Sequence, residues 1–226
     1  MSEVVAIVEG QTEAIFIKDL ITPYLAQKGI FLTPIVVSKP GQKGGDIRFA
    51  RVKRDLELHL KQRHDTYVTL FVNYYGIRND WPGIDEARKK KVPARIAAIV
   101  NKSTMEAVQA LFGETDPDRR FIPFVAVHEF ETLLFSDAGI LAAELGVKRA
   151  KVDAILNECG EPEKINNSNE TAPSKRLEDL NDRFKKTSTG IAIARAIGLS
   201  KMRAACPLFD EWMTKLESLE GRADAA

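Results

Sequence analysis

Residues 66–72 read Thr-Tyr-Val-Thr-Leu-Phe-Val and give the strongest strand signal in the chain. β-Branched and aromatic side chains fill this run, and they favour strands because they pack well on a pleated surface. Working outward, short apolar runs at 3–8, 33–37 and 121–127 predict three more strands. These four strands set the fold class through what separates them.

Helical patterns lie between the strands. Residues 13–27, 47–62 and 84–112 carry apolar side chains at helical spacing, with Thr12 as the expected N-cap of the first helix and Pro93 at a start or kink within the third. Alternation of strand and helix is typical of an α/β fold, here a mostly parallel sheet with helices on both faces.

Strand signals stop after Glu129. The runs at 130–135, 138–145, 148–158, 174–184, 191–197 and 208–219 all look helical, and residues 161–173 form a polar loop between them. The sequence therefore predicts an α/β core over residues 1–128 and a helical extension over residues 129–220 that packs on it.

The composition indicates a cytoplasmic protein. The chain has 226 residues, 44% of them hydrophobic and 29% charged, with a formal net charge of +1. We expect no signal peptide and no membrane span, because no apolar run approaches the roughly 20 residues that a bilayer needs. Cys159 and Cys206 lack metal-binding spacing and are expected to be reduced thiols. The balanced charge excludes a strongly basic nucleic-acid binder, although local patches decide such binding.

Polar side chains follow three of the predicted strands. Glu9 and Glu13 come after the first, Asn73 after the third, and Glu129 and Glu131 after the fourth. Ligands of open α/β sheets bind beyond the carboxyl ends of the strands, so these oxygens should share one rim. Mg²⁺ or Mn²⁺ held by carboxylates and a substrate phosphate fits such a set.

Each of these residues also has a purely structural interpretation. Glu13 suits the first turn of a helix because of the helix dipole, and the same holds for Glu129 if a helix starts there. Asn73 is a common turn former. Glu9 is harder to explain structurally, since it ends a buried strand just before Gly10. The segment from His128 to Glu131 lacks the two-histidine spacing of a zinc protease, which makes zinc the less suitable metal.

Basic residues that could contact nucleic-acid phosphates are more scattered. Lys175 and Arg176 lie at an expected helix start, where a solvated basic turn is the simpler interpretation. Lys43 lies in a glycine- and lysine-rich loop that does not match a phosphate-loop motif. Trp81 could stack on a base, but we favour a role in fixing its loop.

Five segments taken in order resemble a known group of proteins. They are 8–13 (Val-Glu-Gly-Gln-Thr-Glu), 71–76 (Phe-Val-Asn-Tyr-Tyr-Gly), 80–83 (Asp-Trp-Pro-Gly), 128–131 (His-Glu-Phe-Glu) and 171–176 (Thr-Ala-Pro-Ser-Lys-Arg). The first resembles the opening motif of TOPRIM domains, found in topoisomerases, primases and OLD-type nucleases. The whole set is similar to a TOPRIM-like bacterial family of unknown function, of the DUF4276 type and like abortive-infection L proteins. Members of that family are often encoded beside an ATPase in phage-defence loci.

This resemblance implies a TOPRIM-like core and a metal-dependent nuclease that acts on DNA, tRNA or another RNA with a neighbouring AAA- or ABC-type ATPase. Glu9 and Glu13 would hold one Mg²⁺ or Mn²⁺ with position 73, while Glu129 and Glu131 would serve a second site. Glu9, Glu131 and Lys175 would be catalytic. Lys43, His128, Lys175 and Arg176 would contact the nucleic acid, and a homodimer is plausible.

The sequence departs from the family pattern at two positions. The family is expected to have an aspartate where Asn73 stands, and the TOPRIM pattern expects a second acid where Tyr75 stands. Both changes remove negative charge and so favour an alternative, a catalytically inactive regulatory subunit that docks on the ATPase. A phosphotransfer or small-ligand enzyme fits least well, because no glycine-rich phosphate loop is present.

Overall fold

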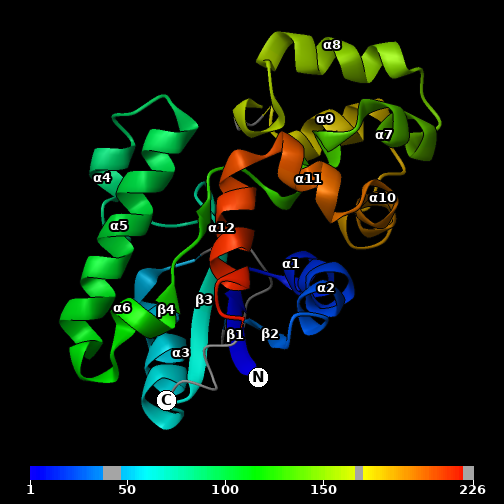
Figure 1. Ribbon diagram of the computed structural model, residues 1–226. Coiled ribbons are helices and arrows are strands. Elements are labelled where there is room, and N and C mark those ends of the chain that lie inside the picture. The colour runs from blue at the N-terminus through cyan, green and yellow to red at the C-terminus, as the bar shows by residue number, and fades with distance from the viewer. Residues whose placement is uncertain (38–46, 166–169, 221–226) are drawn as a thin grey trace.

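A computed structural model describes residues 1–37, 47–165 and 170–220 (Figure 1). Its centre is a parallel sheet of β1 (Ser2–Val8), β2 (Ile30–Val36), β3 (Thr66–Asn73), β4 (Phe121–Ile122) and β5 (Val125–Ala126). The strand order is β2-β1-β3-β4, and β5 also pairs with β3. The predicted α/β class with a parallel sheet is confirmed, and the run at 66–72 forms β3, one of the two central strands.

The expected fourth strand is in fact two short ones. Pro123 separates β4 from β5, and proline has no N–H to donate to a sheet ladder. The ladder continues around it, since Val72 N–H donates to the Phe124 carbonyl at 3.4 Å. On the outer side, Val125 N–H is satisfied by Asn101 Oδ1 at 2.8 Å.

The first connection combines α1 (Gln11–Phe16), the π-helix η1 (Ile17–Ile21) and α2 (Thr22–Ala26). It is followed in turn by α3 (Phe49–Gln62), α4 (Ile84–Ala87), α5 (Pro93–Phe112), η2 (Gly113–Thr115) and α6 (Pro117–Arg120). Pro93 starts α5, as predicted. The expected N-cap at Thr12 is wrong, because the cap is Gly10 and Thr12 is buried in the first turn.

After β5, the described chain is helical. Its elements are η3 (Phe130–Ser136), α7 (Ala138–Leu145), α8 (Arg149–Cys159), η4 (Pro162–Lys164), α9 (Pro173–Leu180), the π-helix η5 (Lys186–Gly190), α10 (Ile191–Ile197), α11 (Leu199–Ala205) and α12 (Pro207–Glu217). Figure 1 shows α7 to α11 beyond the carboxyl ends of the strands, opposite the N-terminus. Cys159 and Cys206 are free thiols. No described helix is both long and apolar enough to cross a membrane.

The side chains of the sheet alternate between two hydrophobic layers. Val4, Ala6 and Val8 of β1 face a cluster that also contains α1, α2 and most of the helical part, whereas Val5 and Ile7 face α3 and α5. The helical part and the sheet therefore share one core.

The last helix, α12, runs across the sheet and connects the C-terminal part of the described chain to its first strand (Figure 1). Trp212 Nε1–H donates to Thr69 Oγ1 at 2.9 Å, and Ser2 Oγ donates to the Leu219 carbonyl at 2.7 Å. These bonds satisfy buried polar groups that would otherwise lack partners, and they hold α12 and the residue Leu219 after it against β3 and β1.

Candidate functional site

The candidate site lies between the carboxyl ends of β1 and β3. The chain leaves β1 toward β2 on one side and later places β3 on the other side of β1, so the strand order reverses here. Such a switch point leaves a crevice where ligands bind in open α/β folds. Glu9 directly follows β1 at this point, and its Oε2 accepts a hydrogen bond from Asn73 N–H at 3.2 Å. Glu9 therefore bridges the two central strands.

Gly76 is what makes room for this carboxylate. A Cβ atom at position 76 would lie 2.7 Å from Glu9 Oε1 and 2.8 Å from Glu9 Oε2, closer than real Cβ contacts allow. Only glycine leaves the carboxylate in place. This contact gives a structural reason for the glycine that ends segment 71–76, and it links that segment to segment 8–13.

Glu13 lies in the first turn of α1, beside Glu9. Burial raises the pKa of Glu13 to about 7, against opposing main-chain hydrogen bonds at Glu13 and Gly10, and the charge of Glu9 adds to the rise. The two carboxylates thus repel one another within a confined space. A divalent cation between them would relieve that repulsion.

Glu129 and Glu131 approach the same rim from the start of η3. The Lys186 ammonium lies 3.3 Å from Glu129 Oε1 and 3.0 Å from Glu131 Oε1. The Glu131 side chain is only 2% exposed, and burial raises its pKa to about 7 despite the opposing charge of Lys186. Burial lowers the pKa of Lys186, but Glu131 and Glu129 outweigh it and leave that pKa above its ordinary value.

Glu129 also links the rim to the helical part. Its Oε2 accepts a hydrogen bond from Ser174 N–H at 3.1 Å, in the first turn of α9. A carboxylate in this position accepts a hydrogen bond from an otherwise unpaired N–H and is stabilised by the helix dipole. The sequence interpretation concerned a helix that starts at Glu129, but this side chain does not cap η3 and instead meets the start of α9, 45 positions away in the sequence.

Sequence reasoning missed Lys186. Its charge also reaches Glu13, so it connects the two acidic pairs. Lys186 opens the π-helix η5, a type of turn that is rare and often found at functional sites. The only sequence signal is a pair of lysines before Thr-Ser-Thr-Gly, which by composition looks like an ordinary polar loop.

The Asn73 side chain forms a hydrogen bond within its own turn. Its Oδ1 accepts a hydrogen bond from Tyr75 N–H at 3.0 Å, as in a turn formed by an asparagine side chain. The structural interpretation of Asn73 therefore describes its oxygen correctly. Whether this oxygen also binds a metal stays a prediction.

His128 is buried beneath Tyr75. The two rings are 6.0 Å apart with an interplanar angle of 27°. Burial lowers the pKa of His128 to about 4, against weaker opposing effects from the Glu163 main chain and the Glu129 charge. The imidazole is thus neutral at pH 7, and a contact between His128 and phosphate would not be an ion pair.

The other predicted basic residues lie around this cluster in different settings. Lys175 is half-exposed and pairs with Glu178 on its own helix. Arg176 holds Glu158 through both Nη atoms at 3.1 Å, which joins α9 to α8. Lys43 falls outside the described residues. Trp81 is 2% exposed and donates to Thr104 Oγ1 at 2.9 Å, so it fixes its loop as favoured.

The described residues set a limit on how a metal could bind. Over 1–37, 47–165 and 170–220, no group of three or more histidine, cysteine, aspartate or glutamate side chains is arranged to hold one. Mg²⁺ often binds through only one or two carboxylates, with waters and substrate phosphates completing its shell. Glu9 and Glu13 fit that kind of site.

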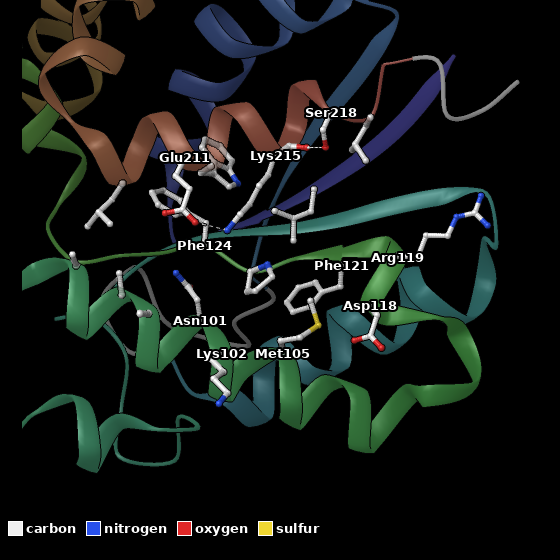
Figure 2. A pocket seen from close by; sticks show the side chains of 18 residues that line it. Asn101, Lys102, Met105, Asp118, Arg119, Phe121, Phe124, Glu211, Lys215 and Ser218 are labelled. Atoms are coloured by element: carbon white, nitrogen blue, oxygen red, sulfur yellow. Dashed lines mark hydrogen bonds and ion pairs between the residues drawn. The ribbon is translucent and has the colours of Figure 1, made fainter. Parts of the chain in front are cut away.

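A hollow of about 540 Å³ lies away from this rim, along the β4 edge between α5 and α12 (Figure 2). Its walls combine apolar side chains such as Met105 and Phe121 with the ion pair of Lys215 and Glu211. None of the four rim glutamates lines it. The acidic chemistry and this hollow are separate features.

The comparisons identify the family but no activity. The family described as a domain of unknown function, DUF4276, matches residues 8–217. The chain belongs to this family. The match spans Glu9, the rim glutamates and Lys186, and it confirms the DUF4276-type resemblance; the relation to TOPRIM domains stays a prediction. No curated protein and no solved structure matches the chain.

Proposed function

We propose that this DUF4276 protein is a metal-dependent nuclease that hydrolyses phosphodiester bonds. One observation carries the proposal: Glu9 bridges β1 and β3 at their switch point, and its charge reaches Glu13, whose pKa burial raises to about 7. Paired carboxylates at the ligand-binding end of a parallel sheet are suited to a hard cation that also binds phosphate.

Glu9 and Glu13 would hold Mg²⁺ or Mn²⁺. When bound, such an ion supplies a Lewis acid for the phosphate and lowers the pKa of a coordinated water. The rest of the chemistry falls to side chains of this chain. Glu131, with a pKa of about 7, suits proton transfer at neutral pH.

Lys186 changes the expected mechanism from two ions to one. Its ammonium sits against Glu129 and Glu131, where the resemblance implies a second metal. A fixed positive charge there would stabilise the charge that develops on the leaving oxygen. In this proposal Lys186 takes the part first expected of Lys175, because Lys175 is half-exposed and paired with Glu178.

The setting of the proposed activity rests on the resemblance alone. It adds a cytoplasmic location, a role in phage defence, a neighbouring AAA- or ABC-type ATPase as partner and a possible homodimer. DNA, tRNA and other RNA are all candidate substrates.

Two observations favour a second function, a catalytically inactive subunit that regulates the ATPase. The Asn73 oxygen accepts a hydrogen bond from Tyr75 N–H, and the Lys186 ammonium contacts both Glu129 and Glu131. In that case the rim would be structural and the helical part would dock on the partner.

Metal binding separates these two functions. We would titrate Mg²⁺ and Mn²⁺ by calorimetry into the unaltered chain and into Asn73→Asp, Glu9→Gln and Glu13→Gln, with Glu144→Gln, an exposed glutamate of α7, as control. The nuclease proposal expects binding that Glu9→Gln and Glu13→Gln abolish and Asn73→Asp strengthens. An absence of binding in both the unaltered chain and Asn73→Asp would favour the docking role.

Cleavage is then measured on plasmid DNA and tRNA with each metal, with and without the neighbouring gene product. We expect Glu9→Gln to lower the rate at least about 100-fold, since oxygen ligands and charge stabilisation of this kind commonly account for such factors. Equal cleavage by Glu9→Gln and Glu144→Gln would show that the site is misassigned.

A further inference from the structure

Tyr75 is a large aromatic side chain on the rim that the fold leaves open. It is 48% exposed, whereas Trp81 in the following loop is 2% exposed and Tyr74 is 7% exposed. Its position is nevertheless fixed from beneath. The ring stacks on His128 at 6.0 Å, meets the Tyr74 ring edge-on at 5.1 Å, and its N–H is held by Asn73. Because these contacts already hold the ring in place, a ligand can bind to its exposed apolar face with little loss of side-chain entropy.

A small basic pocket adjoins this ring. It has a volume of about 280 Å³, and its lining includes Tyr74, Tyr75, Ile77, Ile84, Arg88 and Lys90. Two cations therefore share the pocket with two tyrosines. Arg88 donates to Asn79 Oδ1 at 2.7 Å, which orients its guanidinium, and the carboxylate of Asp85 that it pairs with is 3.8 Å away and 86% exposed. Because this ion pair is exposed and weak, the charge of Arg88 is available to a ligand.

The pocket is next to the proposed metal site. Tyr75 directly precedes Gly76, where an added Cβ would lie 2.7 Å from Glu9 Oε1.

We propose that this pocket binds an unpaired nucleobase and its flanking phosphate, and that the substrate is single-stranded nucleic acid. This inference rests on the proposed nuclease function and deepens it. A base stacks on the face of Tyr75, and Arg88 and Lys90 hold the adjacent phosphate, as in aromatic and basic grooves that bind single strands. Bases of a duplex are already stacked on each other and cannot reach the ring. The phosphate one step along the strand is then presented to Glu9 and Glu13.

The test measures binding without cleavage. We would record fluorescence anisotropy of labelled 12-nucleotide single-stranded DNA, single-stranded RNA and a DNA duplex of the same sequence, with EDTA present. Tyr75→Ala should weaken single-strand binding about 5- to 100-fold, the range for loss of one base stack, while Tyr75→Phe stays within about twofold. Duplex binding should be weaker from the start and unaffected by Tyr75→Ala. The two single-strand arms show whether DNA or RNA is preferred.

The basic residues give an independent readout. Arg88→Ala together with Lys90→Ala should lower the slope of log affinity against log salt by about 0.7 for each phosphate that the protein no longer neutralises, whereas Tyr75→Ala should leave that slope unchanged. Matched controls are Phe31→Ala, which removes a 45% exposed ring on β2, and Lys102→Ala, which removes a 77% exposed cation on α5.

Three results would overturn the inference: equal single-strand affinity for Tyr75→Ala and Phe31→Ala, tighter binding of duplex than of single strands, or no binding of either by the unaltered chain. None of them depends on metal. If Glu9→Gln still abolishes cleavage while Tyr75→Ala binds normally, the nuclease proposal stands and only the pocket is misassigned.

Discussion

The rim carries two pairs of glutamates that are similar in sequence but held in different ways. Glu9 and Glu13 are anchored by main-chain N–H groups, at Asn73 for the first and at Gly10 and Glu13 itself for the second. Glu129 and Glu131 instead share the ammonium of Lys186. Burial raises the pKa of Glu13 and of Glu131 to about 7 alike.

The difference teaches how to interpret an acidic cluster. A pair that already contacts a lysine has its countercharge supplied by the chain, and adding a cation there would require the lysine to leave. Glu13 is held by main-chain N–H groups, and the charge of Glu9 adds to the rise of its pKa to about 7, so this pair would gain from a cation that displaces the proton of Glu13. We therefore assign a single metal to Glu9 and Glu13. In the other pair, Glu129 anchors the start of α9 and Glu131 is left for proton transfer.

The largest expected effect comes from removing Lys186. Lys186→Met leaves Glu131, whose side chain is 2% exposed, without its countercharge. We expect a loss of about 3 kcal/mol in unfolding free energy at pH 8, toward the low end for a broken buried pair because the lysine is 41% exposed. The measurement is urea unfolding followed by circular dichroism.

Two variants check that interpretation. Adding Glu131→Gln to Lys186→Met should restore most of the loss, because no buried charge then remains. Lys201→Met breaks the more exposed ion pair with Asp137 and should cost less than about 1 kcal/mol. If Lys186→Met and Lys201→Met are equally stable, the second pair does not depend on its lysine and our comparison fails.

An effect that is smaller for each side chain should appear in the pH dependence of stability. The folded pKa values of Glu13 and Glu131 are both about 7, above the ordinary 4.5. Between these values the folded chain binds more protons than the unfolded chain, so unfolding free energy falls as pH rises from about 4.5 to 7. We expect about 2 kcal/mol from each carboxyl, measured by urea unfolding at pH 5 and pH 8.

Magnesium should separate the two contributions. Glu13→Gln and Glu131→Gln should each flatten the fall, but 10 mM Mg²⁺ at pH 8 should recover only the share that belongs to Glu13. Recovery that persists in Glu13→Gln would place the ion at the second pair instead. Glu144→Gln is the control and should leave the pH profile unchanged.

The smallest expected effect on stability is that of Gly76→Ala. The added Cβ would lie 2.7 Å from Glu9 Oε1, so the carboxylate must turn away. We expect a loss of about 1 kcal/mol in unfolding free energy together with loss of the Mg²⁺-dependent shift in melting temperature. Gly113→Ala, whose nearest neighbour would be 3.8 Å away, should retain the shift. A normal shift in Gly76→Ala would mean that Glu9 does not bind the ion.

The sequence predicted the fold better than it predicted the site. Periodicity located the strands to within a few residues and the change to helices after β5, because burial on one or two faces leaves a local pattern. It missed the break at Pro123 and the cap at Gly10, where a single main-chain group decides the outcome. For the site it selected Glu9, Glu13, Glu129 and Glu131, since they follow strands, but it could not find Lys186, whose role depends on contacts 55 and 57 positions away.

By itself, the sequence determined the parallel α/β order and which acids end its strands, because strand and helix signals are local. Only the tertiary structure decided which acid meets which partner: the Asn73 N–H for Glu9, Lys186 for Glu131 and the start of α9 for Glu129. Those partners lie 64, 55 and 45 positions from their glutamates in the sequence, so no local pattern pairs them. They are brought to the rim because the helical part shares its core with the sheet.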